Sequence, residues 1–117
     1  NYIMFLGKSL GTIPIANDLM KRDEFAQSKM ILLTPLLTFD TIFDSILHSR
    51  HEGLLVIGDK DHQYNAAQID QLHKTNLMID VVKNANHSVN VGEYETKNSI
   101  EAIANIIEKL KEVVRKN

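Results

Sequence analysis

Apolar and polar residues alternate along this chain in two kinds of block. Short apolar runs that predict buried β-strands lie at residues 2–6, 30–33, 54–57 and 77–82. Stretches in which apolar residues recur every three or four positions predict amphipathic helices over residues 10–25, 36–47, 63–73 and 98–116. Because strand and helix alternate four times, the pattern predicts an α/β fold, with a four-stranded parallel sheet and flanking helices.

Several local features refine these elements. The helix over residues 10–25 should place on one face its apolar residues Leu10, Ile13, Ala16 and Met20. Pro14 should distort its first turn, because proline has no N–H to donate. Asp80 should mark a less buried end or edge of the last strand, and Asn98 with Glu101 forms a capping box that begins the last helix.

Composition narrows the class of protein. The 117 residues (13.3 kDa) are 44% hydrophobic and 24% charged, which is typical of one small globular domain. The net charge of −2, from 13 basic and 15 acidic residues, argues against binding to nucleic acid or to an anionic membrane. No apolar run is long enough to span a membrane. The absence of Cys excludes disulfides, thiolate metal ligands and a Cys nucleophile.

The beginning of the chain is unusual for a complete protein. Residue 1 is Asn1, and an apolar run starts at once with Tyr2. No signal peptide is recognisable, so the cytoplasm is the default location that we expect. We also expect that the length of the chain bounds a fragment of a larger domain.

The first strand is followed by a motif that carries chemistry. Residues 7–11 read Gly-Lys-Ser-Leu-Gly, which matches the G-x-S-x-G nucleophile elbow in its required place between strand and helix. The turn should be tight enough to present the Ser9 hydroxyl above the sheet, with no room for a side chain at Gly7 or Gly11. The amide of Leu10, at the start of the helix, should point to where an oxyanion forms.

Two other interpretations of this motif stay open. A glycine-rich turn between strand and helix can be purely structural. Gly-Lys-Ser is also the end of the phosphate-binding pattern G-x-x-x-x-G-K-[ST]. That pattern needs its first glycine at residue 2, which is Tyr2, and residues 2–6 are too apolar for a solvated phosphate loop. The hydrolase interpretation is therefore favoured.

The ends of two later strands supply the other residue types. The third strand is followed by Gly58, Asp59 and Asp61, and the fourth is followed by His87. Ser, then Asp, then His is the chain order of an α/β-hydrolase. Since the carboxyl ends of parallel strands meet at one edge of a sheet, these side chains should converge there.

On these motifs the chain resembles the α/β-hydrolase superfamily. The similarity covers the C-terminal half of that fold, from the fifth strand to the final helix, and rests on residues 7–11, 55–61 and 86–88. It implies a serine hydrolase that cleaves an ester, thioester or related acyl bond of a small molecule, with no metal or organic cofactor. Ser9 is then the nucleophile, His87 the general base and acid, and Asp61 the orienting carboxylate, with Asp59 as the alternative.

The resemblance also shows what the chain lacks. In the family, the second oxyanion amide comes from the loop after the third strand, and nothing here corresponds to strands one to four. Residues 1–117 are thus expected to be a single-domain fragment with a bare strand edge at residues 2–6. A preceding segment, a partner fragment or a second copy would complete it. The alternative function is a non-catalytic fragment or binding module.

Other polar and apolar residues could contribute to the rim of such a site. Lys8 could favour an anionic group on the substrate, although this position is often simply exposed. Pro35 and Leu36 follow the second strand and could line a substrate pocket, although Pro35 is equally explained as a strand terminator.

The remaining histidines have simpler explanations. His48 and His51 form a His-x-x-His pair, for which no further metal ligands can be placed, so an exposed helix end is favoured. His62 could line the site, but a solvated loop residue is favoured. His73 near a helix C-terminus suits the helix dipole.

Overall fold

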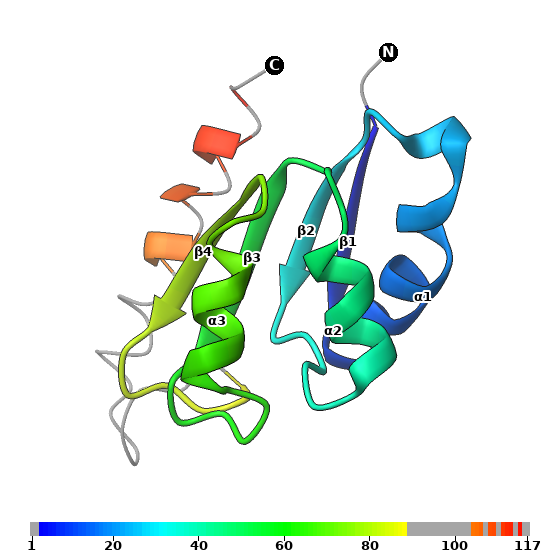
Figure 1. Cartoon of the computed structure of the whole chain (residues 1–117). Helices are drawn as coiled ribbons and strands as arrows, with labels where there is room; N and C mark the ends of the chain where they lie inside the picture. Colours follow the sequence, from blue (N-terminus) through cyan, green and yellow to red (C-terminus); the bar gives the residue numbers. More distant parts are fainter. Residues whose placement is uncertain (1–2, 89–103, 107, 110, 114, 116–117) are drawn as a thin grey trace.

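The computed structural model describes residues 3–88, 104–106, 108–109, 111–113 and 115 (Figure 1). Its centre is a four-stranded sheet in the order β1-β2-β3-β4, and every neighbouring pair is parallel. The strands are Met4–Lys8 (β1), Lys29–Leu33 (β2), Gly53–Gly58 (β3) and Leu77–Val82 (β4). The prediction of a parallel four-stranded sheet is confirmed.

Helices cover both faces of this sheet. The α-helices Thr12–Asn17 (α1), Asp40–Leu47 (α2) and Ala66–Leu72 (α3) lie together on one face, and the helical residues described between 104 and 115 lie on the other (Figure 1). Alternate residues of a strand point to opposite faces, so β2 and β3 supply both cores. Met30 and Leu32 join the first core, whereas Ile31 packs with Ile106 and Val113 in the second. No described helix has the length and apolar character needed to cross a membrane.

The segment after β1 differs from the single helix predicted over residues 10–25. It consists of short α1 flanked by the 3₁₀ segments Ser9–Gly11, Leu19–Lys21 and Asp23–Phe25. Pro14 lies in the first turn of α1, where its missing N–H removes no helical hydrogen bond. The expected apolar face is wrong at Leu10, whose side chain is 72% exposed because the 3₁₀ turn at Ser9–Gly11 precedes the helix.

Two expectations concern the other end of the chain. Asp80 lies in β4, at the edge of the described sheet, but its side chain is buried and its Oδ1 lies 2.7 Å from Nζ of Lys109. The expected lower burial is therefore wrong, because an ion pair compensates the carboxylate. The capping box of Asn98 and Glu101 lies outside the described residues.

Candidate active site

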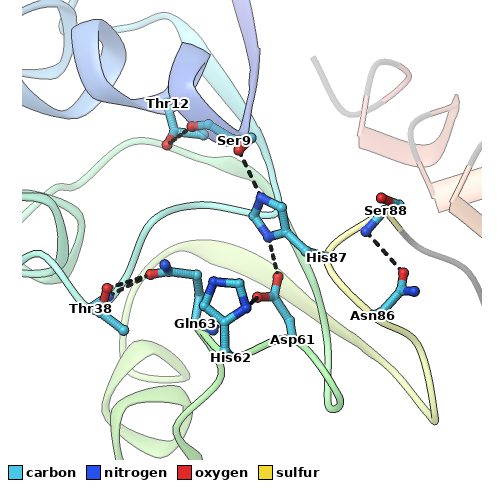
Figure 2. A network of polar contacts seen from close by, with 9 residues as sticks. All are labelled: Ser9, Thr12, Thr38, Asp61, His62, Gln63, Asn86, His87 and Ser88. Atoms are coloured by element: carbon cyan, nitrogen blue, oxygen red, sulfur yellow. Dashed lines mark hydrogen bonds and ion pairs between the residues drawn. The ribbon is translucent and has the colours of Figure 1, made fainter.

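Ser9, His87 and Asp61 form a chain of hydrogen bonds at the carboxyl edge of the sheet (Figure 2). Ser9 Oγ lies 2.7 Å from His87 Nε2, and His87 Nδ1 lies 2.7 Å from Asp61 Oδ2. A carboxylate only accepts hydrogen bonds, so Nδ1 carries a proton and Nε2 is left to accept from the Ser9 hydroxyl. The three residues follow β1, β4 and β3, as their order in the sequence predicts.

The backbone at Ser9 has the conformation of a tight elbow. Its φ is +52°, in the left-handed region that residues other than glycine rarely adopt. A Cβ at Gly7 would lie 2.5 Å from the carbonyl oxygen of Gly11 and 2.6 Å from Cδ1 of Ile15, so residue 7 must be glycine. At Gly11, by contrast, a Cβ would meet nothing within 4 Å. The expectation that both glycines are sterically required is right for Gly7 and wrong for Gly11.

Two further groups shape this elbow. The Thr12 hydroxyl donates a 2.6 Å hydrogen bond to the Ser9 carbonyl oxygen and braces the turn. Leu10 lies in the first turn of the 3₁₀ segment Ser9–Gly11, where backbone N–H groups have no acceptor within the helix. The Leu10 amide thus directly follows Ser9 in this first turn, and its role toward an oxyanion stays a prediction.

The two candidate acids have different partners. The side chain of Asp61 is fully buried, and its Oδ1 accepts a 2.9 Å hydrogen bond from the backbone N–H of Gln63 while Oδ2 faces His87. Asp59 instead accepts a 2.6 Å hydrogen bond from the backbone N–H of Asn84. Asp61 is therefore the carboxylate in contact with the His87 imidazole, and Asp59 contacts the loop that leads to His87.

A contact that the sequence did not reveal extends this network. Gln63 Oε1 accepts hydrogen bonds from the backbone N–H of Thr38 at 2.9 Å and from its hydroxyl at 2.7 Å (Figure 2). The loop after β2 is thereby tied to the loop after β3. No local sequence motif predicts the contact between Thr38 and Gln63, because the two residues are 25 positions apart and meet only when both loops are folded.

The other candidate rim residues lie close to the same edge with different exposure. Lys8 is exposed at the last position of β1, but Pro35 and Leu36 are buried. The neighbouring Phe39 is the exposed apolar residue of this loop, with 53% of its surface accessible. A substrate at this rim would therefore meet Phe39 before it met Pro35 or Leu36.

The histidines other than His87 separate into exposed and buried groups. His48 is exposed, as expected, but His51 is buried, with Nδ1 2.8 Å from the Ser28 carbonyl oxygen and Nε2 3.2 Å from that of Met20. The exposed position expected for His51 is wrong. His62 is 80% exposed and its ring centroid lies 5.8 Å from that of His87, and His73 is exposed after α3. Within the described ranges, no cluster of three or more histidine or acidic side chains could hold a metal ion.

Comparisons with known proteins give structural matches only. No protein-family model matches the chain, and no curated protein does so. A predicted CIB-like hydrolase from Thermoplasma acidophilum superposes with a TM-score of 0.56 at 19% identity, over 86% of this chain and 48% of that one. Puromycin hydrolase superposes with a TM-score of 0.58 at 14% identity, over 97% of this chain and 22% of that one. Its serine-to-alanine mutant in complex with PGG superposes with a TM-score of 0.59 at the same identity and coverage.

These matches establish the fold. The chain has the fold of part of an α/β-hydrolase, and it spans about half the length of the first of these proteins and about a fifth of puromycin hydrolase. At such low identity the likeness extends to the arrangement of strands and helices and carries no further assignment.

Proposed function

We propose that this protein is a serine hydrolase that cleaves an ester, thioester or related acyl bond through an acyl-enzyme intermediate. The observation that carries the proposal is the unbroken hydrogen-bonded chain from Ser9 Oγ through His87 to Asp61, with both links at 2.7 Å. Such a chain is the arrangement that activates a serine hydroxyl. The strained backbone of Ser9 adds weight, because strain of this kind clusters at functional sites.

In the proposed reaction, His87 Nε2 takes the hydroxyl proton as Ser9 Oγ attacks the substrate carbonyl carbon. Asp61 stabilises the imidazolium, and the Leu10 N–H donates to the oxygen on which negative charge develops. When the tetrahedral intermediate collapses, His87 returns the proton to the leaving group. A water molecule then gives a proton to His87 and attacks the acyl-enzyme. The second tetrahedral intermediate expels Ser9 Oγ, which takes that proton back from His87, and the carboxylic acid leaves.

We further propose that residues 1–117 carry the triad of a larger domain. A second oxyanion donor would come from a preceding segment, a partner fragment or a second copy. In the described sheet β1 pairs with β2 along one side, which leaves its other side for an additional strand. One missing oxyanion donor lowers turnover by about 10²–10³-fold in a comparable site, so the completed domain should be much the faster enzyme.

Covalent labelling tests the function directly. A fluorophosphonate probe should label the protein at Ser9, as located by mass spectrometry, and Ser9→Ala should abolish the labelling. Ser88→Ala is the matched control, because Ser88 is exposed beside His87 but its hydroxyl takes no part in the proposed reaction. Labelling at another residue would overturn the proposal. Complete failure to label would favour the non-catalytic alternative.

A further inference from the structure

The carboxamide of Gln63 has an orientation that its neighbours determine. The backbone N–H of Thr38 can only donate, so the atom 2.9 Å away from it must be an acceptor. That atom is therefore Oε1, and it also accepts from the Thr38 hydroxyl. It follows that Nε2, with two N–H donors, faces away from Thr38.

These two donors have no hydrogen-bond partner among the described residues, although Gln63 is only 7% exposed. Among the described residues, the fully buried side-chain atom without a hydrogen-bond partner is Thr34 Oγ1, so Gln63 Nε2 remains accessible from outside and is able to donate to a ligand. Another glutamine of this rim behaves differently, since Gln68 Nε2 donates to the Leu37 carbonyl oxygen at 3.2 Å. Both glutamine side chains contact the loop after β2, but only the carboxamide N–H groups of Gln63 lack a partner among the described residues.

Gln63 is also in direct contact with the triad. Its backbone N–H donates to Asp61 Oδ1, and its side chain reaches the loop after β2 (Figure 2). Because β2 lies between β1 and β3, this side chain crosses the same rim that carries Ser9 and Asp61. The unpaired N–H groups therefore belong to the edge at which a substrate of Ser9 would bind.

We propose that Gln63 determines specificity by donating a hydrogen bond from Nε2 to a carbonyl oxygen of the substrate other than the carbonyl that Ser9 attacks. This inference rests on the proposed hydrolase function. A ketone, ester or amide oxygen has the required chemistry, whereas a hydrocarbon of the same shape leaves both donors unpaired. Sites that hydrogen-bond a substrate group discriminate strongly against analogues that lack it.

Matched pairs of esters test this inference on the full chain. Levulinoyl and isocaproyl esters of one alcohol differ by a ketone oxygen in place of a methyl group in the acyl half. Hydroxyacetone and isobutyl esters of one acid make the same comparison in the alcohol half. The ratio of kcat/KM within each pair, from titration of the released acid, reports recognition of the oxygen on that side.

We expect the wild-type protein to prefer the ketone in one pair, and Gln63→Met to reduce that preference about tenfold, as for the loss of one hydrogen bond. Gln63→Glu should reduce it as well, although its carboxylate still accepts from Thr38. Gln68→Met is the matched control and should keep the wild-type ratio. Melting temperatures establish that all three variants are folded.

The outcomes separate the two proposals. Unchanged ratios in both Gln63 variants, with hydrolysis intact, would overturn the specificity role and leave the hydrolase standing. An equal fall in Gln68→Met would also overturn it, because the effect would then come from disturbing the loop after β2, which both glutamine side chains contact. If no ester is hydrolysed faster than by Ser9→Ala, the hydrolase proposal fails and the role of Gln63 fails with it.

Discussion

A Cβ on Gly58 would lie 2.1 Å from the carbonyl oxygen of Ala85, so the end of β3 and the loop that carries His87 are in direct backbone contact. Two hydrogen bonds fasten the same contact, from Lys60 N–H to the Ala85 carbonyl oxygen at 2.9 Å and from Asp59 N–H to the Val82 carbonyl oxygen at 3.1 Å. The separation of Asp61 from His87 is therefore set by main-chain packing.

We expect Gly58→Ala to force these two segments apart. The added methyl group meets backbone atoms, which cannot rotate away, so the free energy of unfolding should fall by about 1–3 kcal/mol. Turnover should fall too, because His87 moves away from Asp61. Urea unfolding and ester hydrolysis measure the two effects, and a variant as stable and active as the wild type would contradict the packing argument.

The two glycines of the elbow should respond differently to the same change. Gly7→Ala places a methyl group against the Gly11 carbonyl oxygen and should destabilise the protein and distort Ser9. Gly11→Ala meets open space at a φ of −66°, and should leave the melting temperature close to that of the wild type. The melting temperatures of Gly7→Ala and Gly11→Ala, each compared with that of the wild type, test this difference. Equal losses would show that the motif is constrained by something other than steric contact at Gly7.

The two aspartates after β3 should also be separable. Asp61→Asn puts an amide beside His87 Nδ1, which favours the tautomer that cannot accept the Ser9 proton. A loss in kcat of about 10⁴ is the size seen for such a change in a serine protease triad. Asp59→Asn keeps an oxygen acceptor for the Asn84 N–H and should cost less than about tenfold. Equal losses in the two variants would undermine the assignment of Asp61.

Buried His51 should be structural. Its two ring nitrogens face the carbonyl oxygens of Ser28 and Met20, so it ties the chain after α2 to the segments before β2. A neutral imidazole has one N–H, so one of these oxygens accepts a hydrogen bond from the ring. His51→Phe removes that hydrogen bond and should lower the free energy of unfolding by about 1–3 kcal/mol. His48→Phe, at an exposed position, is the control and should change it little. Urea denaturation measures both variants, and equal midpoints for His51→Phe and His48→Phe would rule out a structural role for His51.

Two ion pairs should differ in their effect on stability. Asp80→Asn weakens the contact of a buried carboxylate with Lys109 and should destabilise by about 1–3 kcal/mol. The pKa of Asp18 is lowered by its hydrogen bond with Arg22, so that pair contributes while Asp18 is ionised and is lost as the pH falls through its pKa. Both of its side chains are about half exposed, so Asp18→Asn should leave the urea midpoint unchanged at neutral pH.

The sheet could be predicted from the sequence because its two central strands are almost entirely buried. Every residue of β3 is buried, so this strand reads as one continuous apolar run that ends at Gly58. The chemistry-bearing residues follow strand ends, where a parallel sheet necessarily gathers them. Local pattern and global topology therefore agree for Ser9, Asp61 and His87.

The features that escaped prediction depend on how loops pack. Asp59 and Asp61 are equally polar and only two positions apart in the chain, so the sequence does not show that Asp59 contacts the backbone of Asn84 whereas Asp61 contacts His87. Buried His51 contacts carbonyl oxygens of two segments that are distant from it in the sequence. The hydrogen bonds between Thr38 and Gln63 form only when the loops after β2 and β3 are both folded. Helical spacing over residues 10–25 likewise did not reveal the break at Asp18, where the backbone leaves the helical conformation.

The strands lie side by side in the order in which they occur in the chain. During synthesis, the proposed nucleophile Ser9 therefore emerges just after the first described strand, Asp61 after the third and His87 only after the fourth. Until β4 has docked, the Ser9 hydroxyl has no base and is an ordinary alcohol. If Ser9 is the nucleophile, a nascent chain that ends before His87 is unreactive, and a fluorophosphonate would label only molecules in which β4 and the loop after it are in place.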